Sequence, residues 1–323
     1  MNGTYIIGEI GQNHNGSVDL AKLIADFVSK PVVDDLFGIE LKPLNAVKLT
    51  KRDLSQELSV SQMTKIYNNK NSFGRTYGDH RKFLELSDED HFEVYKHAKK
   101  LGLDFVETLC APGCTSILKL FQPDYLKVAS RDLTNLPLLE VLAETNLPII
   151  LSTGMSGKKE LDRALNVIAK KHENISILHC VSQYPTHPDN ANLSTIRFLL
   201  ENYRDYTVGY SDHTIGISAP VAAVAMGAKI IEKHITLDRR MKGTDQKGSL
   251  GPDGVFRMVR DIRLIEKSIG EERIFIADGI NESKEKLERS IASKIDIPKG
   301  TVIKESMLHM LSPGIGFKWD QKN

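Results

Sequence analysis

The chain has 323 residues, a formal net charge of +1 and 41% hydrophobic residues, which suits one large α/β domain with a small appendage. The balanced charge gives no electrostatic support for nucleic acid or a membrane surface as partner. Cys110, Cys114 and Cys180 are too few for a disulfide framework, so a reduced, cytoplasmic compartment is expected. We predict neither a signal peptide nor a membrane helix.

Short apolar runs alternate with helical patterns along most of the chain. The expected strands cover residues 5–9, 46–49, 104–108, 125–128, 148–151, 175–179, 206–210 and 229–231. The expected helices cover residues 18–28, 88–101, 133–144, 158–171, 193–202, 216–227 and 253–269. This alternation, without a run of consecutive strands, favours a closed (β/α)8 TIM barrel. A doubly wound open sheet is the alternative.

Residues 51–86 form a long excursion that ends in KNSFGRTYGDHRKFLELS. A loop of this length in a compact domain is usually functional or disordered. Its Tyr77, His80 and Arg81 favour a functional segment, and a solvated polar loop is the alternative. Tyr77 is therefore included among the candidate substrate contacts.

The pattern changes near the C-terminus. Residues 290–295 alternate like a strand, and residues 297–303 are typical of a turn followed by a second short strand. Some 35 residues are few for an independent core. We therefore divide the chain into a barrel domain at 1–280, a linker at 281–289 and the beginning of a small β-rich domain at 290–323, completed by further sequence or by a partner.

Two histidines follow neighbouring strands at matching positions. His213 comes after Ser211-Asp212, and His234 comes after Glu232-Lys233. Parallel strands end on one face of a sheet, so the two imidazoles are expected to be neighbours. With Asp212, Glu232 and Asp245 nearby, they can hold a divalent cation. Either histidine alone fits a surface or core position, but the pair favours a ligand site.

In a barrel, catalytic groups collect at the carboxyl ends of the strands. Two lysines and several hydroxyls there suit a small substrate with phosphate and carboxylate groups. Glu9 and Tyr184 can handle protons or hydroxyls. The full set at the expected strand ends is Glu9, Asn13, His14, Lys48, Thr108, Lys127, Ser130, Ser152, Ser182, Tyr184, Ser211, His213, His234 and Asp245.

Motifs over about residues 6–269 resemble one family. In chain order they are IIGEIGQNHNGS, AVKLT, TYGDHRKFLELS, DYLKVASRD, PIILSTGM, LHCVSQYP, VGYSDHTIGI and AAVAMGAKIIEKHITLDRRMKGTDQKGSLGPDG. Together they are similar to the sialic acid synthases, the N-acetylneuraminate and related nonulosonate synthases. The resemblance implies condensation of phosphoenolpyruvate with water and an open-chain N-acyl-mannosamine-type aldehyde, or its 6-phosphate. The products are a nonulosonate and phosphate, and Mn²⁺ or Mg²⁺ is required.

The resemblance also implies roles for single residues. His213 and His234 match metal ligands, and Glu9, Tyr184 and Asp245 match positions that hold the sugar and the reacting hydroxyls. The positions that match phosphoenolpyruvate contacts are Lys48, Thr108, Lys127, Ser130, Ser152, Ser182 and Ser211. The implied catalytic set is Glu9, Lys48, Lys127, His213 and His234.

The segment from residue 290 resembles the start of the family's antifreeze-like (SAF) domain. In bacterial members that domain supplies an arginine to the partner subunit's barrel, and Ser312 stands at this place here. The resemblance implies a homodimer. Two other functions stay open at this point: another phosphoenolpyruvate- or aldol-type metal-dependent barrel enzyme, or a non-catalytic barrel that binds a sugar or phosphate.

Overall fold

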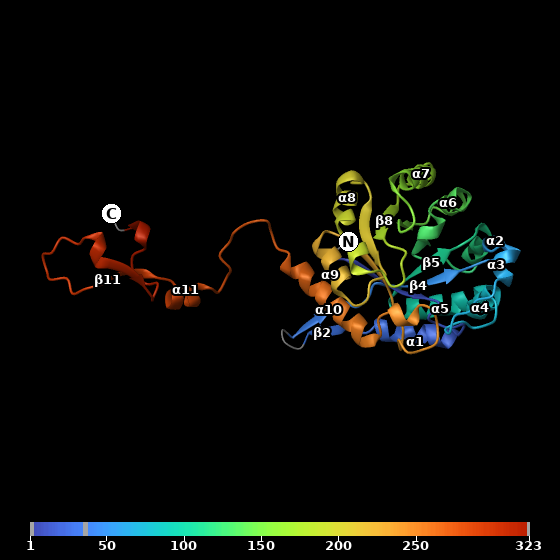
Figure 1. The fold of residues 1–323 in the computed structure, drawn as a ribbon, viewed down its shortest axis with the longest axis horizontal. Helices are drawn as coiled ribbons and strands as arrows, with labels where there is room; N and C mark the ends of the chain where they lie inside the picture. The colour runs from blue at the N-terminus through green and yellow to red at the C-terminus, as the bar shows by residue number, and fades with distance from the viewer. Residues whose placement is uncertain (1–2, 35–37, 322–323) are drawn as a thin grey trace. The chain divides into compact units, whose positions relative to one another are not determined.

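Eight parallel strands close into a barrel in the computed structural model, which describes residues 3–34 and 38–321 (Figure 1). The strands are β1 Tyr5–Gly11, β4 Ala46–Lys51, β5 Asp104–Leu109, β6 Tyr125–Val128, β7 Ile149–Ser152, β8 Ile175–Cys180, β9 Thr207–Asp212 and β10 Ile230–His234. Their order around the barrel is β1-β10-β9-β8-β7-β6-β5-β4. The predicted TIM barrel is confirmed, and the open sheet is wrong.

Helices connect the strands on the outside of the barrel, close to where the sequence predicts them. They are α1 Val18–Val28, α5 Asp88–Lys100, α6 Leu136–Ala143, α7 Lys158–Ile168, α8 Ser194–Asn202, α9 Ser218–Ala225 and α10 Pro252–Ser268. Local signals set their ends. At α5, Ser87 and Asp90 form a capping box in which each side chain accepts a hydrogen bond from the other's backbone N–H.

The barrel interior is stacked in layers. An apolar layer fills its middle and lower part, made of Tyr5, Ile7, Ala46, Val106, Ile150, Leu178 and Ile230 with Tyr125 against it. Side chains two positions apart on a strand share a face, so the next inward residues form a layer above. That upper layer is polar and consists of Glu9, Lys48, Thr108, Lys127, Ser152, Cys180, Ser211 and Glu232. The barrel interior thus places a polar and charged layer, which forms the cavity floor, directly above an apolar layer.

The long segment after β4 is folded rather than irregular, which corrects the expectation of a loop. It contains α2 Leu54–Glu57, α3 Val60–Thr64 and α4 Tyr77–Leu84. The absence of a side chain at Gly78 allows α3 and α4 to pack closely, since a Cβ there would lie 2.6 Å from the carbonyl oxygen of Met63. A further hairpin, β2 Val32–Asp34 with β3 Ile39–Leu41, follows α1.

The chain separates into two compact units, one through Ile269 and one from Gly270. The second contains α11 Asn281–Leu287 and the antiparallel pair β11 Ser290–Ser293 and β12 Leu308–Leu311. The strand expected near 290 is present. The strand expected at 297–303 is wrong: Pro298 lacks a donor, the chain turns at Gly300, and β11 pairs with later residues.

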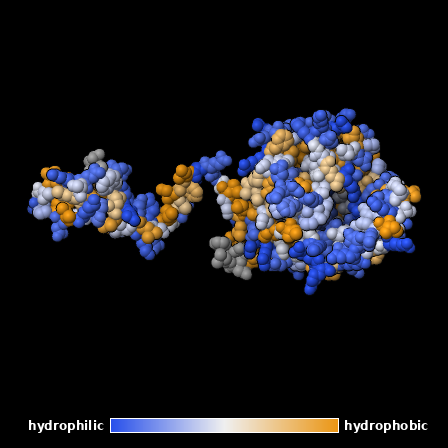
Figure 2. Space-filling model, in the orientation of Figure 1, coloured by the Kyte–Doolittle hydropathy of each residue, from blue (hydrophilic) through white to orange (hydrophobic). Residues whose placement is uncertain are grey.

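The second unit has little core of its own. In its described residues, 270–321, every large hydrophobic side chain is at least partly exposed, including Phe275, Ile303, Ile315 and Phe317. Figure 2 shows such hydrophobic residues on its surface. Across the described chain, no helix is both long and apolar enough to span a membrane.

Candidate active site

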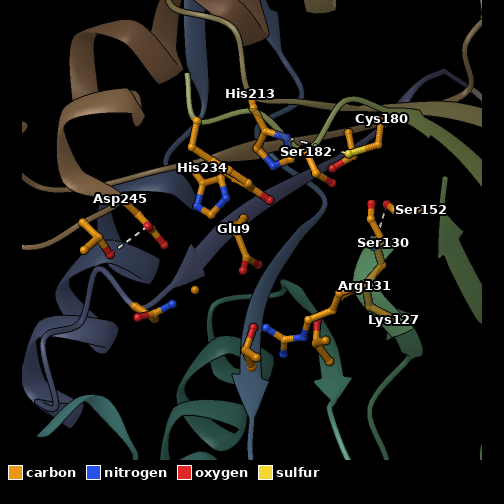
Figure 3. Close-up of a pocket in the computed structure, with 18 of the residues that line it drawn as sticks. Glu9, Lys127, Ser130, Arg131, Ser152, Cys180, Ser182, His213, His234 and Asp245 are labelled. Carbon is orange, nitrogen blue, oxygen red and sulfur yellow. Dashed lines mark hydrogen bonds between the residues drawn. The ribbon is translucent and has the colours of Figure 1, made fainter. Parts of the chain in front are cut away.

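A cavity of about 450 Å³ opens at the carboxyl ends of the barrel strands. The predicted site residues line it, with the exceptions of Tyr77, Asn13 and His14. Figure 3 shows these side chains converging from several strands. Its lining is Glu9, Gly11, Gln12, Lys48, Thr50, Arg52, Tyr67, Asn69, Arg81, Thr108, Lys127, Ala129, Ser130, Arg131, Ser152, Met155, Cys180, Ser182, Tyr184, Ser211, His213, Glu232, His234, Thr244 and Asp245.

The strand register assembles a buried ionic cluster at the cavity floor. Glu9 on β1 lies opposite Lys48 on β4 and opposite His234 on β10. The Nζ atom of Lys48 lies 2.6 Å from Oε2 of Glu9 and 3.9 Å from Oε2 of Glu232. It also donates to Oγ1 of Thr108 at 3.0 Å. One lysine is therefore held between two carboxylates.

The two carboxylates have opposite proton affinities. Burial raises the pKa of Glu9 to about 7, even though Lys48 acts in the other direction. Burial acts upward on Glu232 as well, but Lys127 and Lys48 outweigh it and hold the pKa of Glu232 at about 2. At neutral pH Glu232 is therefore the anion of the pair. Glu9 titrates in the range that a general acid or base needs.

Lys127 is a buried cation with room for an anion. Its Nζ donates to Oγ of Ser152 at 2.7 Å and to the carbonyl of Val128 at 2.9 Å. Within the described residues, no carboxylate oxygen lies within 4.0 Å of this atom. Burial lowers the pKa of Lys127. A buried ammonium in this setting gains from an anionic ligand.

Three serines provide hydroxyl groups beside Lys127. Ser130 accepts a hydrogen bond from the backbone N–H of Gly154 at 3.0 Å. The hydroxyl of Ser182 is buried and has no hydrogen-bond partner among the described residues. An unsatisfied buried hydroxyl is costly and indicates a missing partner. Lys127 with Ser130, Ser152 and Ser182 therefore forms a subsite suited to phosphate oxygens.

The two histidines lie together at the other side of the cavity, with ring centroids 5.5 Å apart. Nδ1 of His213 lies 3.0 Å from the carbonyl oxygen of Val181. Since a carbonyl only accepts, Nδ1 carries the proton and Nε2 presents a lone pair. Nδ1 of His234 is buried without a partner among the described residues, and burial lowers its pKa. Both imidazoles therefore offer nitrogen lone pairs.

Asp212 is not available to a cation, so the expectation that it helps the histidines to hold one is wrong. Its carboxylate accepts from Tyr210, from the backbone and hydroxyl of Thr214, and from Lys233 at 2.5 Å. Successive strand residues face opposite sides, so Ser211 points into the barrel and Asp212 points out. The Asp212–Lys233 pair anchors the turn that carries His213.

We expect Lys233→Met to lower the free energy of unfolding by about 3–5 kcal/mol, because it leaves the fully buried Asp212 carboxylate without its cation. Urea denaturation measures this loss. Lys158→Met is the matched control, since Lys158 and Asp162 form an exposed pair whose removal should change little. Equal effects of the two substitutions would contradict the anchoring role of the buried pair.

The donor set fits a divalent cation held by two protein ligands. No group of three or more His, Cys, Asp or Glu side chains close enough to bind a metal occurs in the described parts of the chain. His213 and His234 both line the cavity with a ring nitrogen free, and Asp245 lies near enough to influence the pKa of His234. The remaining positions around a cation would come from water and substrate oxygens.

Comparisons with known proteins identify the family. The model of the NeuB family matches residues 42–274. This chain belongs to the NeuB family. N-acetylneuraminate-9-phosphate synthase of Homo sapiens is 33% identical over 304 residues, which cover 94% of this chain and 82% of the relative. N,N'-diacetyllegionaminic acid synthase of Campylobacter jejuni is 34% identical over 326 residues, covering 98% and 92%.

A solved structure agrees with this assignment. The crystal structure of N-acetylneuraminic acid synthetase from Leptospira borgpetersenii, in complex with citrate, has a TM-score of 0.71 and 31% identity. The match covers 87% of this chain and 90% of that chain. The resemblance to sialic acid synthases is confirmed, and this NeuB-family chain is a carbon–carbon bond-forming enzyme.

Some predicted residues of this NeuB-family chain lie outside the cavity. Tyr77 on α4 accepts hydrogen bonds from Nε and Nη2 of Arg81 at 2.8 and 2.7 Å, so it supports a lining residue. Asn13 is buried and donates to the carbonyl of Ile235. His14 is buried and accepts from the N–H of Gly16. Asn13 and His14 hold the turn after β1.

Sequence reasoning missed several lining residues. Arg52 and Arg131 face the cavity, as does Glu232, which the sequence suggested only as a carboxylate near the cation. Arg81, which the sequence indicated only as part of a functional segment, also lines the cavity. A signal was present: Arg52 and Arg131 each stand four residues after an inward lysine. A second cavity of about 270 Å³ adjoins the first at the histidines and shares Tyr184, His213, His234, Thr244 and Asp245 with it.

Proposed function

We propose that this chain condenses phosphoenolpyruvate with an N-acyl-mannosamine-type aldehyde sugar and water, giving a sialic-acid-like nonulosonate and phosphate. Membership of the NeuB family supports condensation of phosphoenolpyruvate with a sugar. The observation that carries the proposal for this site is the buried Lys127, which lies among serine hydroxyls in the same cavity as His213 and His234. The lysine and the serines suit a small anion such as phosphoenolpyruvate, and the histidines beside them suit a cation that polarises the sugar aldehyde.

Phosphoenolpyruvate fits the cavity floor. Lys127 with Ser130, Ser152 and Ser182 would hold its phosphate, and Lys48 with Thr108 would hold its carboxylate. Ligand binding would satisfy the free hydroxyl of Ser182. As the phosphate becomes a leaving group, fixed donors around it stabilise the charge that develops.

We propose Mn²⁺ or Mg²⁺ as the cofactor, held by His213 and His234. When bound, the cation supplies Lewis-acid polarisation of the sugar aldehyde. The proposal is supported by the free nitrogens of the two rings. Tyr184 packs against His213 with ring centroids 4.1 Å apart and would limit the movement of that ligand.

Glu9 is proposed as the residue that moves a proton. It forms an ion pair with Lys48 on one side and lies opposite His234 in the strand register on the other. Its pKa of about 7 allows it to accept and return a proton near neutral pH. Water must add to C2 of phosphoenolpyruvate as the carbon–carbon bond forms at C3. Glu9 would orient that water and take its proton.

Phosphate release from phosphoenolpyruvate tests the proposed function. We expect release only when N-acetylmannosamine or its 6-phosphate and Mn²⁺ are present, and we expect EDTA to abolish it. Mass spectrometry of the product should show a nonulosonate. Binding of both ligands without release would favour the non-catalytic barrel, and release with unrelated aldehydes would favour an aldol-type enzyme of broader specificity.

Gly154→Ala tests the phosphate subsite. A Cβ there would lie 2.5 Å from Oγ of Ser182 and 2.9 Å from Sγ of Cys180 and Oγ of Ser130. Since these groups must move, we expect the KM for phosphoenolpyruvate to rise at least about tenfold, the loss of one charge-assisted hydrogen bond. Gly251→Ala is the control, because a Cβ at Gly251 meets nothing within 4 Å. An unchanged KM in Gly154→Ala would remove the serines from the subsite.

We also propose a homodimer in the cytoplasm. The exposed hydrophobic side chains of the C-terminal unit support a partner surface, and the three free cysteines support a reducing compartment. Sedimentation velocity measures the assembly. A monomer at all accessible concentrations would contradict the proposed dimer.

A further inference from the structure

Three arginines line the cavity above the lysine layer. Arg52 follows β4 and Arg131 follows β6, each four residues beyond an inward lysine, and Arg81 comes from α4. β4 ends at Lys51 and β6 ends at Val128, so Arg52 and Arg131 both lie just beyond the carboxyl ends of their strands, at the rim of the barrel.

Carboxylates outside the cavity lining hold two of these arginines in place. Oε1 of Glu57 lies 2.6 Å from Nη1 of Arg52 and 3.6 Å from Nη2 of Arg131. Nε of Arg131 also donates a hydrogen bond to Oδ2 of Asp132 at 3.2 Å. Neither Glu57 nor Asp132 lines the cavity. Arginines that are fixed from outside the cavity are preorganised for a ligand inside it.

Arg81 has an unused donor. Its Nε and Nη2 atoms both donate to the hydroxyl of Tyr77, while Nη1 is buried with no hydrogen-bond partner among the described residues. A guanidinium that is oriented by two bonds and lacks a third partner indicates a missing acceptor.

The charge balance near the arginines also favours an anion. Glu85 lies 3.7 Å from Nε of Arg52, and burial raises the pKa of Glu85 to about 7. Near neutral pH this carboxyl therefore neutralises the arginines only in part.

The arginines stand apart from the histidines. Figure 3 shows Arg131 on one side of the cavity and His213 and His234 on the other, with Glu9 between them. With its aldehyde at the histidines, an open-chain sugar that crosses the mouth of the cavity brings its far end to the arginines.

We propose that Arg52, Arg81 and Arg131 form a second anion subsite, which binds a phosphate on the acceptor sugar at the end remote from the aldehyde. This inference rests on the proposed function and makes it more specific. Guanidinium groups match phosphate oxygens in a bidentate manner, and the lysines and serines below are then left to phosphoenolpyruvate. The acceptor is therefore a phosphorylated N-acyl hexosamine rather than the free sugar.

Steady-state kinetics with both sugars test the subsite. We expect kcat/KM to be higher for N-acetylmannosamine 6-phosphate than for N-acetylmannosamine. Arg81→Gln and Arg131→Gln should each lower kcat/KM for the phosphorylated sugar about 10- to 100-fold, with little effect on the free sugar or on the KM for phosphoenolpyruvate. Arg257→Gln, in an exposed pair on α10, is the matched control.

Two kinetic outcomes would overturn the subsite. One is a wild-type preference for the free sugar, and the other is a loss in the arginine variants that is equal for both sugars or falls on the KM for phosphoenolpyruvate. Calorimetric titration with each sugar separates this inference from the reaction itself. Tighter binding of the sugar phosphate that is lost in Arg81→Gln, without phosphate release, would support the subsite and reject the proposed function. Equal binding of both sugars would reject the subsite.

Discussion

Replacing Lys127 with methionine is expected to reduce turnover by about 10²- to 10⁴-fold. In the proposed complex Lys127 and the phosphate of phosphoenolpyruvate form a buried, hydrogen-bonded charge pair, and the substitution removes its cation. Methionine keeps much of the side-chain volume, so the loss reports the charge. Lys127 is buried and binds only neutral groups directly, Ser152 and the carbonyl of Val128, within the described structure. The measurement is initial-rate phosphate release at saturating sugar.

The same substitution should stabilise the ligand-free protein. Burial lowers the pKa of Lys127 in the folded state, so the charged lysine opposes folding at every pH below its unfolded pKa. Thermal unfolding should therefore show a higher Tm for Lys127→Met than for the wild type. Lys171→Met, on the surface, is the control. A lower Tm combined with unchanged turnover would show that Lys127 is a structural residue.

Glu9→Gln is expected to lower kcat by about 10²- to 10⁴-fold, the usual contribution of a positioned acid or base. In the wild type, kcat/KM should rise with pH through the pKa of about 7, because Glu9 takes a proton in its ionised form. The variant should lack that ionisation. The pH–rate profiles of the two proteins provide the measurement, and a shared inflection near neutral pH would assign it to another group.

Stability gives a second, independent test of Glu9. Its pKa is raised from 4.5 to about 7 in the folded state, so the folded protein binds more protons than the unfolded chain between these values. The wild type should thus lose stability as pH rises through this window. Glu9→Gln should remove that part of the pH dependence. The surface variant Glu201→Gln should behave like the wild type, and a flat wild-type profile would contradict the raised pKa.

The barrel and most of the site were predictable because both follow from local patterns. Apolar runs separated by helical periodicity fix the strand count, and a parallel barrel brings every strand end to one rim. Lys48, Lys127, His213 and His234 could therefore be grouped without knowledge of the contacts between them. The alternation of side chains along β9 also predicts that Asp212 cannot bind the cation. It lies one position after the inward Ser211 and so faces the helices outside the barrel.

The remaining errors arise in segments whose structure is determined by tertiary contacts rather than by local sequence. The helices between β4 and α5 are short and polar, so their periodicity is weak, and their packing depends on close contacts such as that at Gly78. Tyr77 was placed in the correct region, but its orientation depends on Arg81. The C-terminal hairpin skips residues 294–307, and a pairing partner at that separation leaves no local signal.

The apolar layer around Ile7, Val106 and Leu178 closes the lower end of the barrel. Molecules can then reach the lysines only from the rim, past the histidines and arginines. Whatever occupies the deepest position must enter first and is covered by the molecule that follows. With the ligands placed as proposed, we expect an ordered mechanism in which phosphoenolpyruvate binds before the sugar and the nonulosonate leaves before the phosphate beneath it.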